Sequence, residues 1–522
     1  MNTILESLQL ALRLVADGDA ALWSIVALSL QVSATACAVG ALIGLALGAW
    51  LAVARFRGHR ALVWLVNTLL ALPSVVVGLL VYLLLSRAGP LGDLGLLFTP
   101  TAMVIAQSIL VVPLVAALAR RLILGALQDG GDQLRSLGAG ATGSALLLFV
   151  HERLGVLTIA LTGFGRAVAE VGAVMIVGGN IEGVTRVMTT AIALETTKGD
   201  LPLALALGLV LLGVVGVVNL VIGVLQAAAP EPAHGATEAE TPAPLPAREA
   251  RRAADRSAVP ATQALAEAQS VSVRFGAVIA LRDADFVLRR GETIALVGAN
   301  GSGKTTLLRL LHRLVEPATG RCLHLVLQPE GRPPVAAMLF QRPFMLSLSA
   351  RSNLWIGLWL RGVPRDQRAA RCRDALQRVG LDHLAGRPAR ALSGGQQQRL
   401  ALARAWALAP DILYLDEPTA SLDPSAKREI EELIEDVAAS GVTVVMSTHN
   451  LGQAKRLAQR VVYLEGGRLV VDLPTDRFFT EQLPAEAALF LKGELPWNPH
   501  PPMPPAPPPS PSPPAPPAAV PR

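Results

Sequence analysis

Long apolar stretches with few charges fill the first 226 residues of the chain and are missing from the remainder. A helix that crosses a bilayer needs about 20 consecutive, mostly apolar residues. Five stretches meet this requirement: residues 21–54, 61–86, 99–119, 154–178 and 201–226. The pattern predicts an all-α transmembrane domain over residues 1–226 with about five spans.

The arginines between these stretches predict an orientation. They gather after the first span, between the third and fourth, and after the fifth: Arg55, Arg57, Arg60, Arg120, Arg121, Arg135, Arg153, Arg248, Arg251 and Arg252. The opposite loops have fewer basic residues or balance them with acidic ones. Because loops rich in Lys and Arg stay in the cytoplasm, we expect the N-terminus outside and everything after residue 226 in the cytosol.

One segment between the third and fourth spans is too polar to cross the membrane. It begins near Gly131-Asp132, passes Gly138, and continues with an amphipathic pattern to about His151. The pattern predicts a short cytosolic helix that docks another domain. An ordinary loop is the alternative.

Two ionisable residues interrupt the fourth span. Arg166 and Glu170 are four residues apart, so on a helix they share one face and can pair. Charged groups inside a membrane are costly and often mark a pathway. Two interpretations stay open: a pair that only packs helices, or one polar wall of a substrate path.

The whole-chain composition supports a division into a membrane part and a soluble part. Apolar residues make up 52%, charged residues only 16%, and the mean hydropathy is +0.46. The net charge is only +6, and the sequence has no dense cluster of Lys and Arg, which argues against a nucleic-acid partner. We expect a flexible linker over 227–262, a soluble domain over 263–490 and a proline-rich disordered tail over 491–522.

The soluble part begins with a phosphate-binding pattern. A short apolar strand, 293–297, leads into Gly298-Ala299-Asn300-Gly301-Ser302-Gly303-Lys304-Thr305 and then a helix that starts with Thr306. Glycines let backbone N–H groups surround phosphates, and the helix N-terminus adds positive potential. In this pattern the lysine reaches the β- and γ-phosphates and the following Thr ligates magnesium.

A second apolar strand, 411–415, ends in two carboxylates, Asp416 and Glu417. Beside a phosphate loop, Asp416 suits the magnesium shell and Glu417 suits a general base that activates water. Between the two patterns lies Leu392-Ser393-Gly394-Gly395-Gln396, for which neither core packing nor turn chemistry offers an explanation.

With these patterns in this order, residues 266–485 resemble the ATP-binding cassette (ABC) ATPases. The resemblance implies an α/β P-loop fold with a helical subdomain, and it implies roles for further residues. Phe275 matches the aromatic that stacks on adenine. Gln341 matches the loop that senses the γ-phosphate, joins the metal shell and contacts the membrane domain. His449 matches the γ-phosphate histidine.

The same resemblance implies an assembly. Ser393, Gly394, Gly395 and Gln396 match the signature that closes on ATP held by an opposite subunit, and Asp423 matches a loop that passes between subunits. A complete site therefore needs two chains, so we expect a homodimer that binds ATP and Mg²⁺. Every motif is intact, which implies that both sites hydrolyse ATP.

The membrane half resembles importer permeases more than exporters, which have six long spans and an acidic motif before the signature. The segment Leu137-Gly138-Ala139 resembles the permease coupling motif, although its lead residues are Asp132-Gln133-Leu134. The run from Phe164 to Thr196 is similar to permeases for tungstate and, less closely, for molybdate and sulfate. Its polar residues give our predicted transport path: Arg166, Glu170, Asn180, Thr189 and Thr190.

The prediction is therefore a fused permease and ATPase that imports an oxyanion, with tungstate favoured. The resemblance implies a location in the bacterial inner membrane, in contact with lipid, and a separate extracytoplasmic substrate-binding protein. Molybdate or sulfate import, amino-acid or peptide import, a half-size exporter and a membrane-anchored regulatory ATPase remain as alternatives.

Overall fold

A computed structural model describes residues 2–227, 263–327 and 331–492. Contacts divide the chain into two compact units that do not follow chain order. The first contains the N-terminal helices together with Val335–Tyr414 and Pro418–Leu433. The second contains Ala258–Pro334, Leu415–Glu417 and the chain from Ile434 onward. The expected linker and the expected tail lie almost wholly outside the described residues, and the domain boundaries stay predictions.

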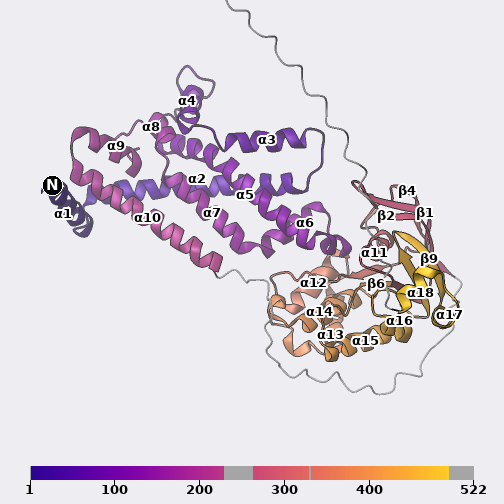
Figure 1. Cartoon of the computed structure of the whole chain (residues 1–522). Coiled ribbons are helices and arrows are strands. Elements are labelled where there is room, and N and C mark those ends of the chain that lie inside the picture. Colours follow the sequence, from indigo (N-terminus) through magenta and orange to yellow (C-terminus); the bar gives the residue numbers. More distant parts are fainter. Residues whose placement is uncertain (1, 228–262, 328–330, 493–522) are drawn as a thin grey trace, which may run out of the picture. The chain divides into compact units, whose positions relative to one another are not determined.

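The N-terminal part is entirely helical in its regular elements (Figure 1). Its elements are α1 (Asn2–Ala16), α2 (Ala20–Val53), α3 (His59–Leu69), α4 (Ser74–Leu85), η1 (Gly92–Leu94), α5 (Pro100–Ser136), α6 (Ala141–His151), α7 (Arg153–Val168), α8 (Gly172–Gly178), α9 (Met188–Lys198) and α10 (Leu201–Ala227). Three of them, α2, α5 and α10, are long and apolar enough to cross a membrane, and two bent pairs raise the number to five. This confirms the predicted helical membrane domain.

Two of the expected spans are broken helices. The second is α3 followed by α4, bent by 101° where Pro73 stands just before α4. Proline removes a backbone donor and disfavours a helical conformation in the residue before it, which explains the break. The fourth also is not one helix: α6 and α7 form the second bent pair, at 81°, and α7 ends at Val168, so that Glu170 lies in the gap before α8.

The expected short docking helix differs as well. The third span does not stop near residue 119, because α5 continues unbroken to Ser136 and so includes Asp132. Gly138 then adopts a left-handed conformation (φ +94°), and the N–H of Ala139 donates to the C=O of Leu134. This is the usual way to end a helix at a glycine. The docking region is thus the end of α5, a turn, and the separate helix α6.

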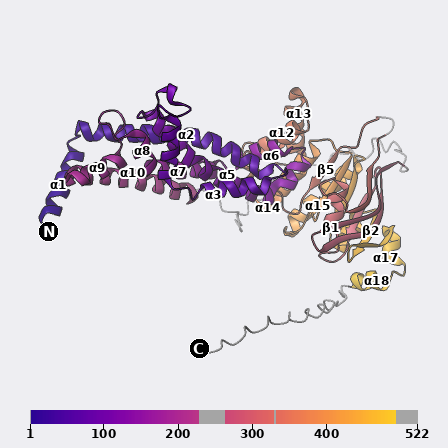
Figure 2. The ribbon, with the colours of Figure 1, turned by 90° about the horizontal axis from the view of Figure 1, so that it is seen from above.

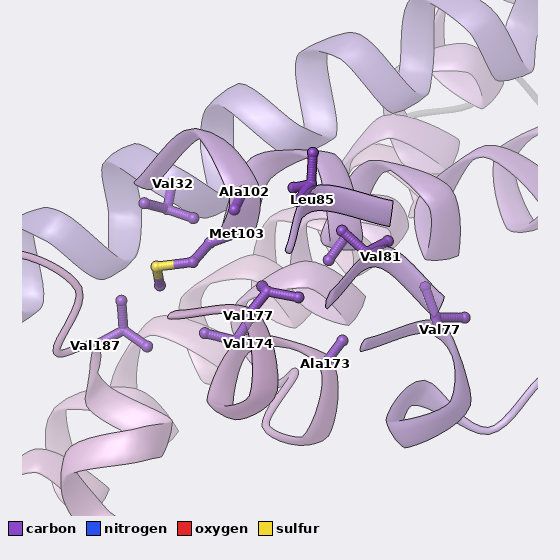
Figure 3. Packing of buried hydrophobic residues seen from close by; sticks show 11 residues of the cluster. Val32, Val77, Val81, Leu85, Ala102, Met103, Ala173, Val174, Val177 and Val187 are labelled. Atoms are coloured by element: carbon purple, nitrogen blue, oxygen red, sulfur yellow. The ribbon is translucent and has the colours of Figure 1, made fainter. Parts of the chain in front are cut away.

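Glycines allow α2 and α5 to pack closely. Gly40, Gly44 and Gly48 recur every four residues on α2, and a methyl group at any of them would come within 2.9 Å of an α5 atom. Such small-residue stripes let membrane helices approach backbone to backbone. Beside this contact, valines of α4 and α8 pack around Met103 of α5 to form an apolar core (Figure 3).

The C-terminal part is an α/β fold. Its strands are β1 (Ala264–Phe275), β2 (Val278–Arg289), β3 (Thr293–Val297), β4 (Thr319–His324), β5 (Ala336–Leu339), β6 (Ile412–Asp416), β7 (Thr443–Ser447), β8 (Arg460–Glu465) and β9 (Arg468–Pro474). Its helices are α11 (Lys304–Leu311), α12 (Ala350–Leu360), α13 (Arg365–Arg378), α14 (Gly394–Trp406), α15 (Pro424–Ala439), α16 (Leu451–Leu457), α17 (Thr475–Thr480) and α18 (Ala485–Lys492), with short turns η2 (Asp382–Leu384) and η3 (Ala389–Ala391).

Two sheets organise these elements. The six-stranded sheet has the order β5-β6-β7-β3-β8-β9, and β3 is parallel to both of its neighbours. Strands β3, β6 and β7 are buried along their whole length and strongly apolar, as expected for a sheet covered on both faces. The smaller sheet, β2-β1-β4, is antiparallel. The predicted P-loop fold with a helical subdomain is confirmed.

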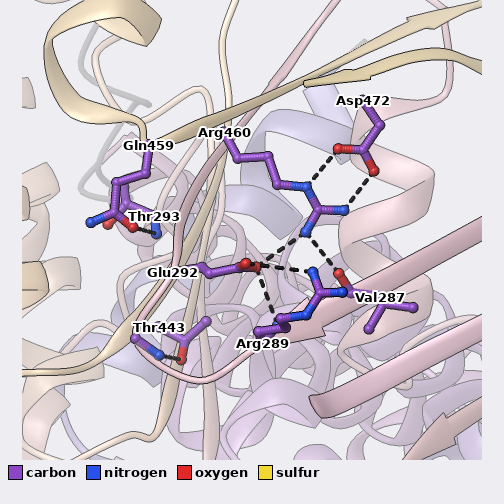
Figure 4. A network of polar contacts seen from close by, with 9 residues as sticks. Val287, Arg289, Glu292, Thr293, Thr443, Gln459, Arg460 and Asp472 are labelled. Atoms are coloured by element: carbon purple, nitrogen blue, oxygen red, sulfur yellow. Dashed lines mark hydrogen bonds and ion pairs between the residues drawn. The ribbon is translucent and has the colours of Figure 1, made fainter. Parts of the chain in front are cut away.

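One arginine ties three strands of this core together. Arg460 on β8 makes a two-pronged contact with Asp472 on β9, with both N–O distances at 2.5 Å, and it also reaches Glu292 at 3.1 Å and the C=O of Val287 on β2 at 3.0 Å (Figure 4). Arg460 is only 17% exposed, so these contacts lie in a partly dry environment. The network lies beside the start of β3, the strand whose other end leads into the phosphate loop.

Candidate ATP site and coupling contacts

The predicted phosphate loop connects the end of β3 to the start of α11. Gly298 and Gly303 have φ of +144° and +106°, a region that glycine adopts without strain. A methyl group at Gly298 would lie 2.2 Å from the C=O oxygen of Leu464, and one at Gly303 would lie 2.7 Å from that of Ala280. The loop therefore needs glycine at both positions for its conformation and for its close packing.

Lys304 begins α11 and points back into the loop. Its Nζ donates to the C=O groups of Gly298 at 2.8 Å and Ala299 at 2.9 Å. Burial lowers the pKa of this lysine, while the negative charges of Glu417 and Asp416 raise it. The structure thus holds a buried ammonium group at the loop, where it would face the phosphates of a nucleotide.

The carboxylate at the end of β6 meets the loop directly. Asp416 Oδ1 accepts hydrogen bonds from Thr305 Oγ1 at 2.8 Å and from Ser447 Oγ at 2.7 Å. This joins the hydroxyl and the carboxylate that the sequence assigns to magnesium. Ser447, at the end of β7, was not among the predicted site residues, although its place before Thr448-His449 is a signal that could have identified it.

Glu417 is held in an uncommon backbone conformation, with φ at +45°. Its N–H donates to Ser447 Oγ at 2.9 Å and to the Ser447 C=O at 3.2 Å. Its carboxylate Oε2 lies 3.5 Å from Nδ1 of His449, which is 63% exposed. Non-glycine residues with positive φ concentrate at functional sites. The predicted base and the predicted γ-phosphate histidine are therefore neighbours.

The loop fits a nucleotide phosphate. Ser302 Oγ is buried without a hydrogen-bond partner among the described residues. A buried hydroxyl that lacks a partner is costly, and a phosphate oxygen is a suitable acceptor. Thr305 and Asp416 offer the hard oxygen ligands that Mg²⁺ prefers. Asn300 and Gly301 lie in the same loop, and Thr306 lies in the first turn of α11.

The signature segment caps the start of a helix. Ser393 is the N-cap of α14: its Oγ accepts from the Gln396 N–H at 3.3 Å, while Gln396 Oε1 accepts from the Ser393 N–H at 3.0 Å. This is a capping box, which the spacing S-x-x-Q predicts. Gly394 follows Ser393, and both are exposed at the start of α14. Ordinary turn chemistry thus accounts for Ser393 and Gln396, contrary to our expectation.

The other predicted nucleotide residues occupy exposed positions. Phe275 ends β1 and is 49% exposed. Asp423 precedes α15 and accepts from the N–H groups of Ser425 and Ala426, both at 3.0 Å, which lowers its pKa. Gln341 is exposed two residues after β5. Their contacts with nucleotide or with a second subunit stay predictions.

The end of α5 contacts the helical subdomain through one buried glutamine. Gln133 Oε1 accepts from the Phe344 N–H at 2.7 Å and from Arg404 Nη2 at 3.1 Å, and its Nε2 donates to the C=O of Arg342 at 2.8 Å. Arg342 directly follows Gln341. A single side chain of the membrane domain therefore binds the segment that the sequence assigns to γ-phosphate sensing.

Arg404 on α14 forms the other half of this contact. It is buried, desolvation lowers its pKa to about 10, and it also donates to the Phe344 C=O at 3.1 Å. At the rim, Arg361 donates to the C=O of Ser136 at 2.6 Å, and the Ser347 N–H donates to His151 Nδ1 at 2.9 Å. These contacts surround an apolar cluster formed by Ile123, Ala126, Leu134, Ala139, Leu148 and Leu346, with Phe344, Ile356 and Leu360 packed against it.

The two predicted coupling residues lie near the end of α5 and in the turn after it, and their role in coupling stays a prediction. Gly138 is part of the contact with the helical subdomain, since a methyl group there would lie 3.4 Å from the Leu360 C=O. Asp132 pairs with Arg135 on its own helix. Gln133 belongs to the stretch that leads into the coupling motif, but a glutamine inside an amphipathic stretch carries no sign of which partner it meets.

The predicted transport-path residues form two contacting groups, one at the break between α7 and α8 and one just after α8. Glu170 is 3% exposed and accepts from Arg166 Nη1 at 2.8 Å, so the expected pair forms. Thr189 Oγ1 donates to the Glu170 C=O at 2.8 Å, and Thr190 Oγ1 lies 2.9 Å from Asn180 Oδ1. Both threonines are buried, with their hydroxyls used in internal hydrogen bonds. A role in transport stays a prediction for all five.

Comparisons with known proteins agree with both halves. Residues 281–420 match the family model described as ABC transporter. The tungstate uptake system permease protein TupB of Peptoclostridium acidaminophilum is 43% identical over 231 residues, covering 43% of this chain and 99% of that protein. A "Probable anion ABC transporter permease protein" of Haloferax volcanii is 42% identical over 201 residues, 38% of this chain and 87% of its own length.

The ATPase half has relatives of its own. The phosphate import ATP-binding protein PstB 2 of Natronomonas pharaonis is 38% identical over 246 residues, covering 43% of this chain and 85% of that protein. The chain therefore belongs to the ABC transporters and is an ATP-hydrolysing membrane transporter. More particularly, it unites in one polypeptide an importer permease region homologous to a tungstate permease and an ABC ATPase.

Proposed function

We propose that this chain imports an oxyanion, most favourably tungstate, across the bacterial inner membrane. Its active form would be a homodimer supplied by a separate extracytoplasmic binding protein. The observation that carries the proposal is the 43% identity to a tungstate permease over 99% of that permease. The ATPase half is not informative about the substrate, because its relatives are named for phosphate import, glutamine transport and aliphatic sulfonates import.

The residues around the phosphate loop support the following division of labour. The loop from Gly298 to Thr305, with Lys304, would bind the phosphates of ATP, and bound Mg²⁺, held by Thr305 and Asp416, would neutralise their charge. Glu417 would orient the attacking water and accept its proton, since its carboxylate stands beside the loop. His449, 3.5 Å from Glu417, would hold that carboxylate and contact the γ-phosphate.

The contacts of Gln133 support a route from ATP to the membrane. Ser393 of one subunit would close on the ATP of the other, as the exposed cap of α14 permits. Gln341 would respond to the γ-phosphate, and Arg342, the next residue, is bound by Gln133. Because α5 continues from Gln133 into the membrane domain as one helix, movement of the helical subdomain would be passed along it.

On the transport path, Arg166 is the cation that an oxyanion would meet. Its guanidinium is 45% exposed, whereas its partner Glu170 is almost fully buried. Glu170 would therefore orient Arg166 rather than meet the substrate. The buried hydroxyls of Thr189 and Thr190 support a positioning role for these residues in the resting conformation.

Metal analysis of cells with and without this chain, grown with equal trace tungstate and molybdate, tests the proposal. Selective loss of tungsten is the expected result. Loss of both metals would indicate a shared oxyanion importer. Unchanged amounts of both would refute oxyanion import, and the search would turn to amino acids.

A further inference from the structure

An open groove on the helical subdomain is lined by two tryptophans. It has a volume of about 380 Å³ and is lined by Trp355, Ile356, Trp359, Arg365 and Arg368. The two tryptophans are one turn apart on α12, and the arginines belong to α13, which packs beside it (Figure 2). Trp359 is 49% exposed, so a large part of its apolar ring system lies at the surface and not in the core.

The groove is prearranged by its own contacts. The guanidinium of Arg368 lies 5.8 Å from the centre of the Trp355 ring, and its Nε donates to the C=O of Val363 at 2.7 Å. The adjacent face of α12 is anchored by Leu354 and Leu358, which are 1% and 0% exposed. The aromatic face is therefore held in place on a rigid helix.

The polar side-chain groups that line the groove are all hydrogen-bond donors. Tryptophan offers an indole N–H and arginine offers guanidinium N–H groups, and neither side chain can accept a hydrogen bond. The remaining surface is aromatic and aliphatic. A matching ligand must therefore be apolar and rich in acceptors.

We propose that this groove binds the proline-rich segment 496–522, from the same chain or from a second copy. Fifteen of these 27 residues are proline, and none is acidic. Proline has a C=O but no N–H, so such a segment offers acceptors and apolar rings. Proline-rich segments bind aromatic-lined grooves in this way, with their rings packed on indole faces.

The chain is long enough for this contact. Thirty residues follow Lys492, the last described residue. At about 3.1 Å per residue in an extended proline helix, they span roughly 90 Å. A domain of the size of the cassette is about 45 Å across. The segment is therefore longer than a domain of this size is wide. An anionic lipid headgroup would suit the guanidiniums but would leave the indole faces without a partner.

Binding at this groove would affect coupling. Ile356 lines the groove and also packs against the apolar cluster around Leu134 where α5 meets the helical subdomain. The proline-rich segment would thus contact a residue that supports the docking of the membrane domain.

Photo-cross-linking in the full-length protein tests the inference. A Met503→p-benzoylphenylalanine variant is purified in a detergent without anionic lipid, irradiated, and its adducts are mapped by mass spectrometry. The adducts are expected on residues 355–368. Trp359→Ala should reduce their yield by about tenfold, the loss expected for an aromatic anchor. The matched control, Trp64→Ala, removes a tryptophan that is 68% exposed on α3 and should leave the yield unchanged.

Retained ATP hydrolysis in both variants verifies that they fold. A double substitution, Arg365→Gln with Arg368→Gln, should also reduce the yield, because it removes the donors while keeping both rings. The inference is wrong if adducts scatter over other surfaces, or if Trp359→Ala gives the wild-type yield. It is also overturned if vesicles of phosphatidylglycerol suppress the adducts, since the groove would then be a lipid site.

Discussion

Replacing Gln133 with alanine should loosen the contact between the membrane domain and the helical subdomain. The substitution removes the acceptor of the Phe344 N–H and of Arg404, and the donor to the exposed Arg342. An unsatisfied buried amide costs about 1 kcal/mol and a buried cation that loses one of its bonds about 2 kcal/mol. Water can replace the contact at Arg342. The free energy of docking should therefore fall by about 3 kcal/mol, or roughly a hundredfold in the docking equilibrium.

Hydrogen–deuterium exchange of the full-length protein measures this loss directly, because the Phe344 amide is one of the groups involved. The peptide covering residues 342–348 should exchange about a hundredfold faster in Gln133→Ala. Gln128→Ala, an exposed glutamine five residues earlier on α5, is the control and should have no effect. Gln133→Glu keeps the oxygen that Phe344 and Arg404 use and should recover most of the protection. Wild-type exchange in Gln133→Ala would refute the reasoning.

Two further substitutions test the ATPase core. Gly303→Ala places a methyl group 2.7 Å from the Ala280 C=O at a φ of +106°. ATP affinity should therefore fall more than about tenfold in a nucleotide-binding assay. The control variant Gly386→Ala, which has open space around the new methyl group, should bind ATP normally. Arg460→Met should lower the free energy of unfolding of the cassette by about 2–3 kcal/mol, since Asp472 loses its two-pronged partner. An unchanged midpoint of thermal ATPase inactivation would contradict this prediction.

The sequence predicted the class of each half well, because both rest on local patterns. Apolar length identifies membrane helices, and a glycine loop followed by Lys304 specifies a phosphate site whatever surrounds it. The structure adds the contacts between residues that are far apart in the sequence. Ser447 joins Asp416 and Glu417 only because β6 and β7 end side by side.

The helix breaks and the coupling contact illustrate the same limit. Hydropathy does not register that Pro73 bends the second span or that α7 ends before Glu170, since most residues on either side of both breaks are apolar. Gln133 became a candidate only when its side chain was found between Phe344 and Arg404, which are more than 200 residues away in sequence.

The most direct test of the account is ATP-driven uptake of labelled tungstate. Right-side-out membrane vesicles that contain the full chain are loaded with ATP and supplied with periplasmic extract as the source of binding protein. We expect tungstate to accumulate in wild-type vesicles loaded with ATP. It should not accumulate in vesicles loaded with ADP or in vesicles that carry Glu417→Gln. This variant retains the hydrogen bonds made by the backbone amide of residue 417 but lacks the base. Equal accumulation with Glu417→Gln would contradict the claim that this chain couples ATP hydrolysis to oxyanion import.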